Sequence, residues 1–147
     1  NVNSYLRTEE VGNMASVSSA VPRVREKLLS LQRKLARDMS VVMDGRDIGT
    51  TILPDADVKI YLTASSLTRA KRRYLELQEK GTVCNLDEIQ KDIEERDQRD
   101  MNREISPLRQ AEDAILVDSS DLTIQQVVDR ILQIFRSKTA GEKSHEN

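Results

Sequence analysis

The sequence predicts an α/β fold, in which helices connect the parallel strands of a sheet. Short apolar runs at 40–43 and 114–117 are typical of buried strands, and a further strand is expected at 57–62, after a turn at Pro54 and Asp55. Apolar residues three or four positions apart between and after these runs are typical of amphipathic helices. Strands that alternate with helices imply parallel pairing through right-handed crossovers. We find no internal repeat, and the length fits one domain over residues 1–137.

The first predicted helix and strand lie in the N-terminal third of the chain. Pro22 suits the first turn of a helix, which is expected to end near Ala36. Its apolar stripe consists of Val24, Leu28, Leu31 and Leu35. The strand predicted at 40–43 ends abruptly at Asp44, so a loop is expected at its carboxyl end.

The middle of the chain predicts a strand, a helix and a second, highly charged helix. The strand at 57–62 is followed by Ser65 or Ser66, either of which can cap a helix that ends at Gly81. The charged helix extends from about Asn85 to Glu104.

The C-terminal part predicts one more strand and a last helix. Polar residues follow the strand at 114–117, and Thr123 caps the helix. The apolar stripe of this helix consists of Ile124, Val127, Val128, Ile131, Leu132 and Phe135. Residues 138–147 are polar and are predicted to form a disordered tail.

The composition excludes several functional classes. With 23 Lys and Arg against 25 Asp and Glu, no overall basic field favours nucleic acid or a membrane surface. Cys84 is the only cysteine and His145 the only histidine, so neither a disulfide framework nor a His/Cys metal set is expected. No basic and apolar leader segment opens the chain, and a cytoplasmic monomer is expected.

The charged helix carries the most informative pattern. Its apolar stripe at positions 86, 89 and 93 continues, at the same spacing, with Arg96, Asp100 and Arg103. Charges that face the body of a protein need partners or a ligand, and guanidinium groups match phosphate oxygens. The alternative is that the helix projects into solvent, with Arg96 and Asp100 as a weak ion pair. The pattern alone leaves both interpretations open.

Two further segments are candidates for anion binding. After the strand at 40–43, the glycines at 45 and 49 allow close backbone approach, Arg46 offers a phosphate fork, and Asp44 is able to hold Mg²⁺ through water. An ordinary turn with a local ion pair is the alternative. In the helix after Ser66, basic residues crowd the first turns, which is repulsive unless anions bind there; a solvated basic face is the simpler interpretation. These basic residues are Arg69, Lys71, Arg72 and Arg73.

Taken together, these segments resemble the bacterial cytidylate kinase family of nucleoside monophosphate kinases. The matching segments are RTEEV at 7–11, VPRVR at 21–25, DGRDIGT at 44–50, LQEKG at 77–81, ERDQRDMNR at 95–103 and VDS at 117–119. The resemblance implies a parallel sheet like that of P-loop kinases, with flanking helices. Residues 1–36 would form part of the CMP-binding region and residues 65–104 the lid region.

The resemblance also implies roles for individual residues. Matching positions assign Ser16, Arg25 and Asp47 to the cytosine. Arg96 and Asp100 match the contacts to the ribose. Arg46 and Arg103 match the groups on the CMP phosphate.

The remaining matches concern ATP. Arg72 lies in the part of the chain that resembles the lid over ATP, and with Arg46 and Arg103 it would act in catalysis. Ser119 lies near the expected place of the adenine. Asp44 matches an indirect partner of Mg²⁺.

The implied reaction is transfer of the γ-phosphoryl group of ATP to CMP or dCMP, assisted by Mg²⁺. None of the glycines precedes a lysine, so the chain lacks the G-x-x-x-x-G-K-[ST] phosphate loop, and with it the N-terminal strand of the family. The isolated chain is therefore expected to be inactive.

Two alternatives remain. One is a monophosphate kinase for another base, such as UMP, which the set of Ser16, Arg25 and Asp47 disfavours. The other is a noncatalytic domain in which the helix at 85–104 forms a coiled-coil arm, although its stripe does not stay apolar.

Overall fold

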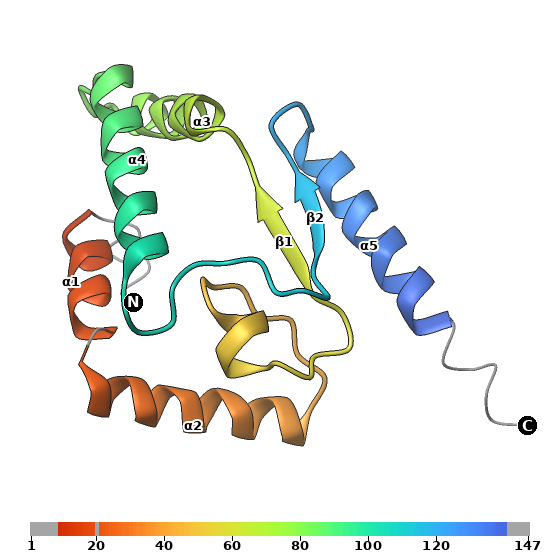
Figure 1. The fold of residues 1–147 in the computed structure, drawn as a ribbon. Coiled ribbons are helices and arrows are strands. Elements are labelled where there is room, and N and C mark those ends of the chain that lie inside the picture. Colours follow the sequence, from red (N-terminus) through yellow and green to blue (C-terminus); the bar gives the residue numbers. More distant parts are fainter. Residues whose placement is uncertain (1–8, 20, 141–147) are drawn as a thin grey trace, which may run out of the picture. The chain divides into compact units, whose positions relative to one another are not determined.

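The computed structural model describes residues 9–19 and 21–140, drawn in colour in Figure 1. The chain is divided into two compact units, residues 1–44 and residues 45–147. The single domain predicted for residues 1–137 stays a prediction. Each unit is described below by itself.

The N-terminal unit is a pair of helices, α1 (Glu9–Ser19) and α2 (Pro22–Asp38). Pro22 occupies the first turn of α2, as predicted, because its fixed φ suits a helix start and it has no N–H to leave unpaired there. The helix continues two residues beyond the predicted end at Ala36. Its apolar stripe is half-exposed, with Leu31 and Leu35 each at 48%.

The strand predicted at 40–43 is absent, which corrects the sequence analysis. Residues 40–44 form neither helix nor strand, and the side chain of Val42 is fully exposed. An apolar run becomes a strand only by hydrogen bonding to a neighbouring strand. Among the described residues, the sheet consists of two other segments, so this run has no strand to pair with.

The C-terminal unit contains the parallel pair of strands that the α/β prediction requires. Strand β1 (Ile60–Thr63) pairs with β2 (Ile115–Asp118) in parallel, with Ile60 opposite Ile115. The first three residues of the strand predicted at 57–62 precede β1, which extends one residue further than predicted. The long connection between the strands carries two helices, α3 and α4. Because the strands are parallel, the polar residues at their carboxyl ends lie at one edge of the sheet.

The two connecting helices begin at caps that the sequence encodes. Ser65 accepts a hydrogen bond from the Thr68 amide at 3.1 Å at the start of α3 (Ser66–Glu79). Asn85 accepts from the Asp87 amide at 2.8 Å at the start of α4 (Leu86–Asn102). Between them, Gly81 has a φ of 71°, a left-handed conformation that suits a residue without a Cβ.

Helix α5 (Ile124–Ala140) corrects two predictions. It buries Ile134, whereas Ile124 is 87% and Phe135 51% exposed, so the predicted stripe is only partly covered. In Figure 1, α5 lies beside β2 of the two-stranded sheet. The helix also continues to Ala140, so disorder is wrong for residues 138–140; residues 141–147 lie outside the described part. None of the described helices is long and apolar enough to cross a membrane.

Candidate functional site

The Asp100 cluster consists of Arg46, Arg96, Asp100 and Arg103. Asp100, near the end of α4, is buried with 8% of its surface exposed. The Arg46 Nε donates a hydrogen bond to Oδ2 of Asp100. Arg96 Nε lies 4.0 Å from the same oxygen, and Arg103 Nη1 lies 4.0 Å from Oδ1. The loop that carries Arg46 therefore meets α4 at Asp100. The pattern in the sequence had left open whether the charged face of α4 meets the protein or solvent.

The local backbone structure places Arg46 beside the Asp100 carboxylate. The loop leads into a π-helical turn, η1 (Ile48–Ile52), in which the Asp47 carbonyl accepts from the Ile52 amide at 3.1 Å. A Cβ on Gly45 would stand 3.0 Å from the Ile48 side chain, so a larger residue there would require that side chain to shift. Asp47 is buried in this turn at 7% exposure.

Arg103 is held by the segment that follows α4. Its Nε donates to the Ser106 carbonyl at 2.6 Å, and Ser106 has a positive φ of 51°. The Leu108 amide donates to the Asp100 carbonyl at 2.8 Å and closes the segment back onto the helix. The backbone conformation after α4 therefore orients Arg103. It also fixes the last turn of the helix, which carries Asp100.

The charge of the cluster favours an anion. Three guanidinium groups surround one carboxylate, so these four side chains carry a net charge of two positive units. The side chains of Arg46 and Arg96 are 39% and 50% exposed, which leaves N–H groups accessible from solvent. A planar guanidinium can bind a phosphate through two parallel hydrogen bonds. The arrangement can therefore bind a phosphorylated ligand beside a buried carboxylate acceptor.

The basic start of α3 is organised differently, because each of its arginines contacts an acceptor within the chain. The Arg72 guanidinium donates to the Ser119 carbonyl at 2.6 Å and to its hydroxyl at 3.3 Å. Arg73 pairs with Glu76 at 2.9 Å. Arg72 and Ser119, both predicted on the ATP side, are thus in contact with each other.

The carboxyl ends of the strands are tied together around Ser119. Its hydroxyl donates to the Thr63 carbonyl at 3.0 Å, and the Ser65 amide donates to the Ser120 hydroxyl at 2.9 Å. Asp118 accepts from the Ser120 hydroxyl and amide, and these hydrogen bonds lower the pKa of its carboxyl. This edge of the sheet is a connected polar network, as expected where parallel sheets place ligands.

Three other predicted site residues lie in the N-terminal unit. Arg25 lies in α2 of the N-terminal unit, and the side chain of Ser16, in α1, lies outside the described side chains. Their grouping with Asp47 stays a prediction. Asp44 is exposed at the end of the same unit. No group of three or more metal-binding side chains occurs among the described residues.

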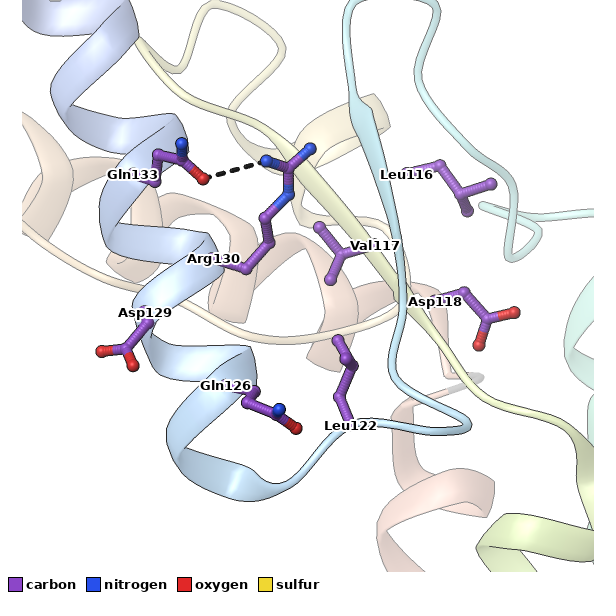
Figure 2. A pocket seen from close by; sticks show the side chains of 8 residues that line it. All are labelled: Leu116, Val117, Asp118, Leu122, Gln126, Asp129, Arg130 and Gln133. Atoms are coloured by element: carbon purple, nitrogen blue, oxygen red, sulfur yellow. Dashed lines mark hydrogen bonds between the residues drawn. The ribbon is translucent and has the colours of Figure 1, made fainter.

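A separate hollow of about 600 Å³ lies between β2 and α5, as Figure 2 shows. It is open and shallow, and Arg130 donates within it to the Gln133 side chain at 3.0 Å. None of the sequence-predicted site residues lines it. Buried charge and a surplus of guanidinium groups instead distinguish the Asp100 cluster as the candidate site.

Two ion pairs were not predicted from the sequence. Arg69 forks onto both oxygens of Asp97, with distances of 2.9 and 2.5 Å. Lys59 pairs with Asp113 at 2.8 Å, which lowers the pKa of that carboxyl. In both cases the partners are far apart in sequence, so periodicity within one element carries no signal for them.

The chain is similar to known kinases over nearly its whole length. The family model described as cytidylate kinase matches residues 1–137. Cytidylate kinase of Desulfitobacterium hafniense is 53% identical over 137 residues, which cover 93% of this chain and 59% of that protein. The cytidylate kinase of Enterobacter sp. is 52% identical over 139 residues, which cover 95% of this chain and 61% of that protein.

A third relative gives the same result. Cytidylate kinase of Alkaliphilus metalliredigens is 48% identical over 140 residues, which cover 95% of this chain and 64% of that protein. The chain therefore spans about 60% of the length of these relatives.

Proposed function

This chain belongs to the cytidylate kinase family, and we propose that it supplies the CMP-binding part of an enzyme that transfers the γ-phosphoryl group of ATP to CMP and dCMP. The observation that carries the proposal is the Asp100 cluster. Its surplus of guanidinium groups suits a nucleotide phosphate, and its buried carboxylate suits a sugar hydroxyl.

The proposed roles are those that the family resemblance implies, and the geometry of the cluster supports them. Arg46 and Arg103 bind the CMP phosphate and spread the charge that develops during transfer, while Arg96 and Asp100 contact the ribose. Asp100 holds Arg46 through a hydrogen bond, so the phosphate-binding group is oriented before the nucleotide arrives. No side-chain nucleophile is needed, because in-line transfer between nucleotides depends on positioning and charge.

Base selection is proposed to depend on Ser16, Arg25 and Asp47. A carboxylate accepts a hydrogen bond from the exocyclic amine of cytosine, whereas uracil offers a carbonyl oxygen at that position. Asp47 is buried and follows Arg46 directly in the chain. A base read by Asp47 would therefore lie close to the phosphate-binding loop.

The ATP side is proposed to include Arg72 and Ser119, which contact each other at the carboxyl end of β2. Mg²⁺ usually keeps several waters and is bound by one or two carboxylates together with substrate phosphates. The exposed Asp44 fits such a water-mediated contact, and the ion would neutralise charge on the ATP phosphates.

Nucleotide binding by the chain tests the proposal. Isothermal titration calorimetry should show CMP binding more tightly than UMP or AMP. Asp47→Ala should reduce CMP affinity by about 1–3 kcal/mol, through loss of a buried charged hydrogen bond, and leave UMP affinity nearly unchanged. Equal affinities for the three nucleotides, or CMP affinity unaffected by Asp47→Ala, would contradict the assignment.

Turnover provides the second test. Because the sequence contains no G-x-x-x-x-G-K-[ST] loop, we propose that the chain alone produces no ADP when it is mixed with ATP and CMP. A coupled assay for ADP measures this directly. CMP-dependent ADP production by the isolated chain would overturn this part of the proposal.

A further inference from the structure

Arg69, which the sequence suggested only as part of a basic face of its helix, makes a contact between α3 and α4. Arg69, in the first turn of α3, donates through Nη1 and Nη2 to the two carboxylate oxygens of Asp97 in α4. Its Nε donates at 3.0 Å to the carbonyl of Ala64, which follows β1 directly. One guanidinium group therefore joins the end of a strand and two helices.

The surroundings favour a fixed geometry for this group. Ala64 is buried, and Ala70, the neighbour of Arg69, is completely buried. Ser66 donates to Glu94 at 2.6 Å, so a second contact joins the same parts of α3 and α4. The hydrogen bonds that Arg69 donates to Asp97 raise the pKa of the Arg69 guanidinium above its ordinary value. These contacts therefore hold together the two helices, which cross in Figure 1.

The position of Asp97 connects this contact to the candidate site. Asp97 follows Arg96 directly and precedes Asp100 by three residues, so it lies within one helical turn of both. A change in the orientation of α4 about Asp97 would therefore displace both members of the cluster. On α3, Arg72 lies one turn after Arg69 and contacts Ser119.

From these contacts we infer that Arg69 is a positioning residue, which holds α4 in the orientation that brings the Asp100 cluster onto CMP. The inference rests on the proposed function. Arg69 itself need not touch the nucleotide. Arg69 is bonded to the end of β1 and lies in the same helix as Arg72. It therefore fixes the position of the Asp100 cluster relative to the carboxyl ends of the strands.

The experiment compares two conservative substitutions in the same helix. Arg69→Lys keeps the charge but cannot fork onto Asp97 while also reaching Ala64. Arg73→Lys is the matched control, because Arg73 pairs with Glu76 inside α3 and not with α4. Calorimetry measures CMP affinity, and hydrogen exchange measures the Leu108 amide, which is bonded to the Asp100 carbonyl.

Arg69→Lys is expected to weaken CMP binding by about fivefold and to speed exchange of the Leu108 amide, whereas Arg73→Lys changes neither. Asp97→Asn should resemble Arg69→Lys, and the double variant should lose little more than either alone, since both remove one interaction. A merely stabilising role would instead lower the urea midpoint without changing CMP affinity.

Two results would overturn the inference. One is CMP affinity and Leu108 exchange unchanged in Arg69→Lys, and the other is an equal loss in Arg73→Lys. If the unsubstituted chain bound no CMP, while Leu108 exchange still responded to Arg69→Lys and not to Arg73→Lys, the proposed function would fail and the positioning of the Asp100 turn would stand.

Discussion

The Asp100 cluster and the basic start of α3 both gather arginines, but they differ in how many acceptors the chain provides for each guanidinium group. In α3, Arg69, Arg72 and Arg73 each contact an acceptor of the chain. Around Asp100, three guanidinium groups share one carboxylate. Positive charge that is already matched serves to hold elements together, whereas surplus positive charge is available to a ligand.

The largest effect is expected from removing the charge at the centre of the cluster. Asp100→Asn leaves three guanidinium groups without their carboxylate, and we expect the free energy of unfolding to fall by about 2 kcal/mol. This is below the range for fully buried pairs, because solvent screens Arg46 and Arg96. Urea denaturation measures the change.

The matched control for this substitution is Asp129→Asn. Asp129 is exposed on α5 and accepts a hydrogen bond from Gln125. We expect a change within about 0.5 kcal/mol. An equal fall in the free energy of unfolding in the two variants would show that Asp100 does not hold the three arginines in place.

The next effect tests the matched arginines of α3. Arg72→Met keeps a long side chain but removes the hydrogen bonds to Ser119 and Leu122. We expect a loss of about 1 kcal/mol in urea denaturation, together with faster exchange of the Ser119 amide. A variant as stable as the parent would indicate that Arg72 is held for a ligand and not for the fold.

A smaller effect separates surplus charge from matched charge directly. Inorganic phosphate at a concentration equal to its dissociation constant should stabilise the chain by about 0.4 kcal/mol, or about 1–2 °C in thermal midpoint. Arg103→Met should abolish this shift, whereas Arg73→Met should retain it. If both variants lost the shift equally, the distinction between the two regions would be wrong.

The smallest effect concerns Glu76, the half-buried carboxylate that pairs with Arg73. Hydrogen bonds from Lys80 and then from Arg73 lower its pKa from 4.5 to about 2. Because the folded pKa is the lower one, its contribution to stability is present above pH 4.5 and is lost as the pH falls toward 2.

An NMR titration of the Glu76 carboxyl measures this shift. Lys80→Met should raise the pKa more than Arg73→Met does, because the Lys80 hydrogen bond is the larger cause. A carboxyl that titrates at its ordinary value in the parent chain would contradict the pairing.

The strands and helices were predicted with uneven success, and the failures share a cause. The cap at Thr123 was predicted correctly, and Ser65 is the cap of the two serines that the sequence offered for α3. A side-chain oxygen near the amides of the first turn is a local arrangement. The run at 40–43 has the composition of a buried strand, but pairing depends on a neighbour that no local pattern specifies. The covered flank of α5 likewise depends on what the helix packs against.

The candidate site shows the same division. The change in the α4 stripe after position 93 predicted that Arg96, Asp100 and Arg103 share a face, because helical spacing is a property of the sequence. That Arg46 donates to Asp100 across 54 positions follows from the η1 turn and the crossover between the strands.

By itself, the sequence determined the class of fold, the helix caps and the one helix face on which apolar residues give way to charge. All three depend on residues a few positions apart. Only the tertiary structure decided which guanidinium groups are matched and which are in surplus, and that Arg69 and Asp97 join α3 to α4. Ion pairing depends on distances of a few ångströms between side chains, and contacts between distant segments arise only when the chain folds.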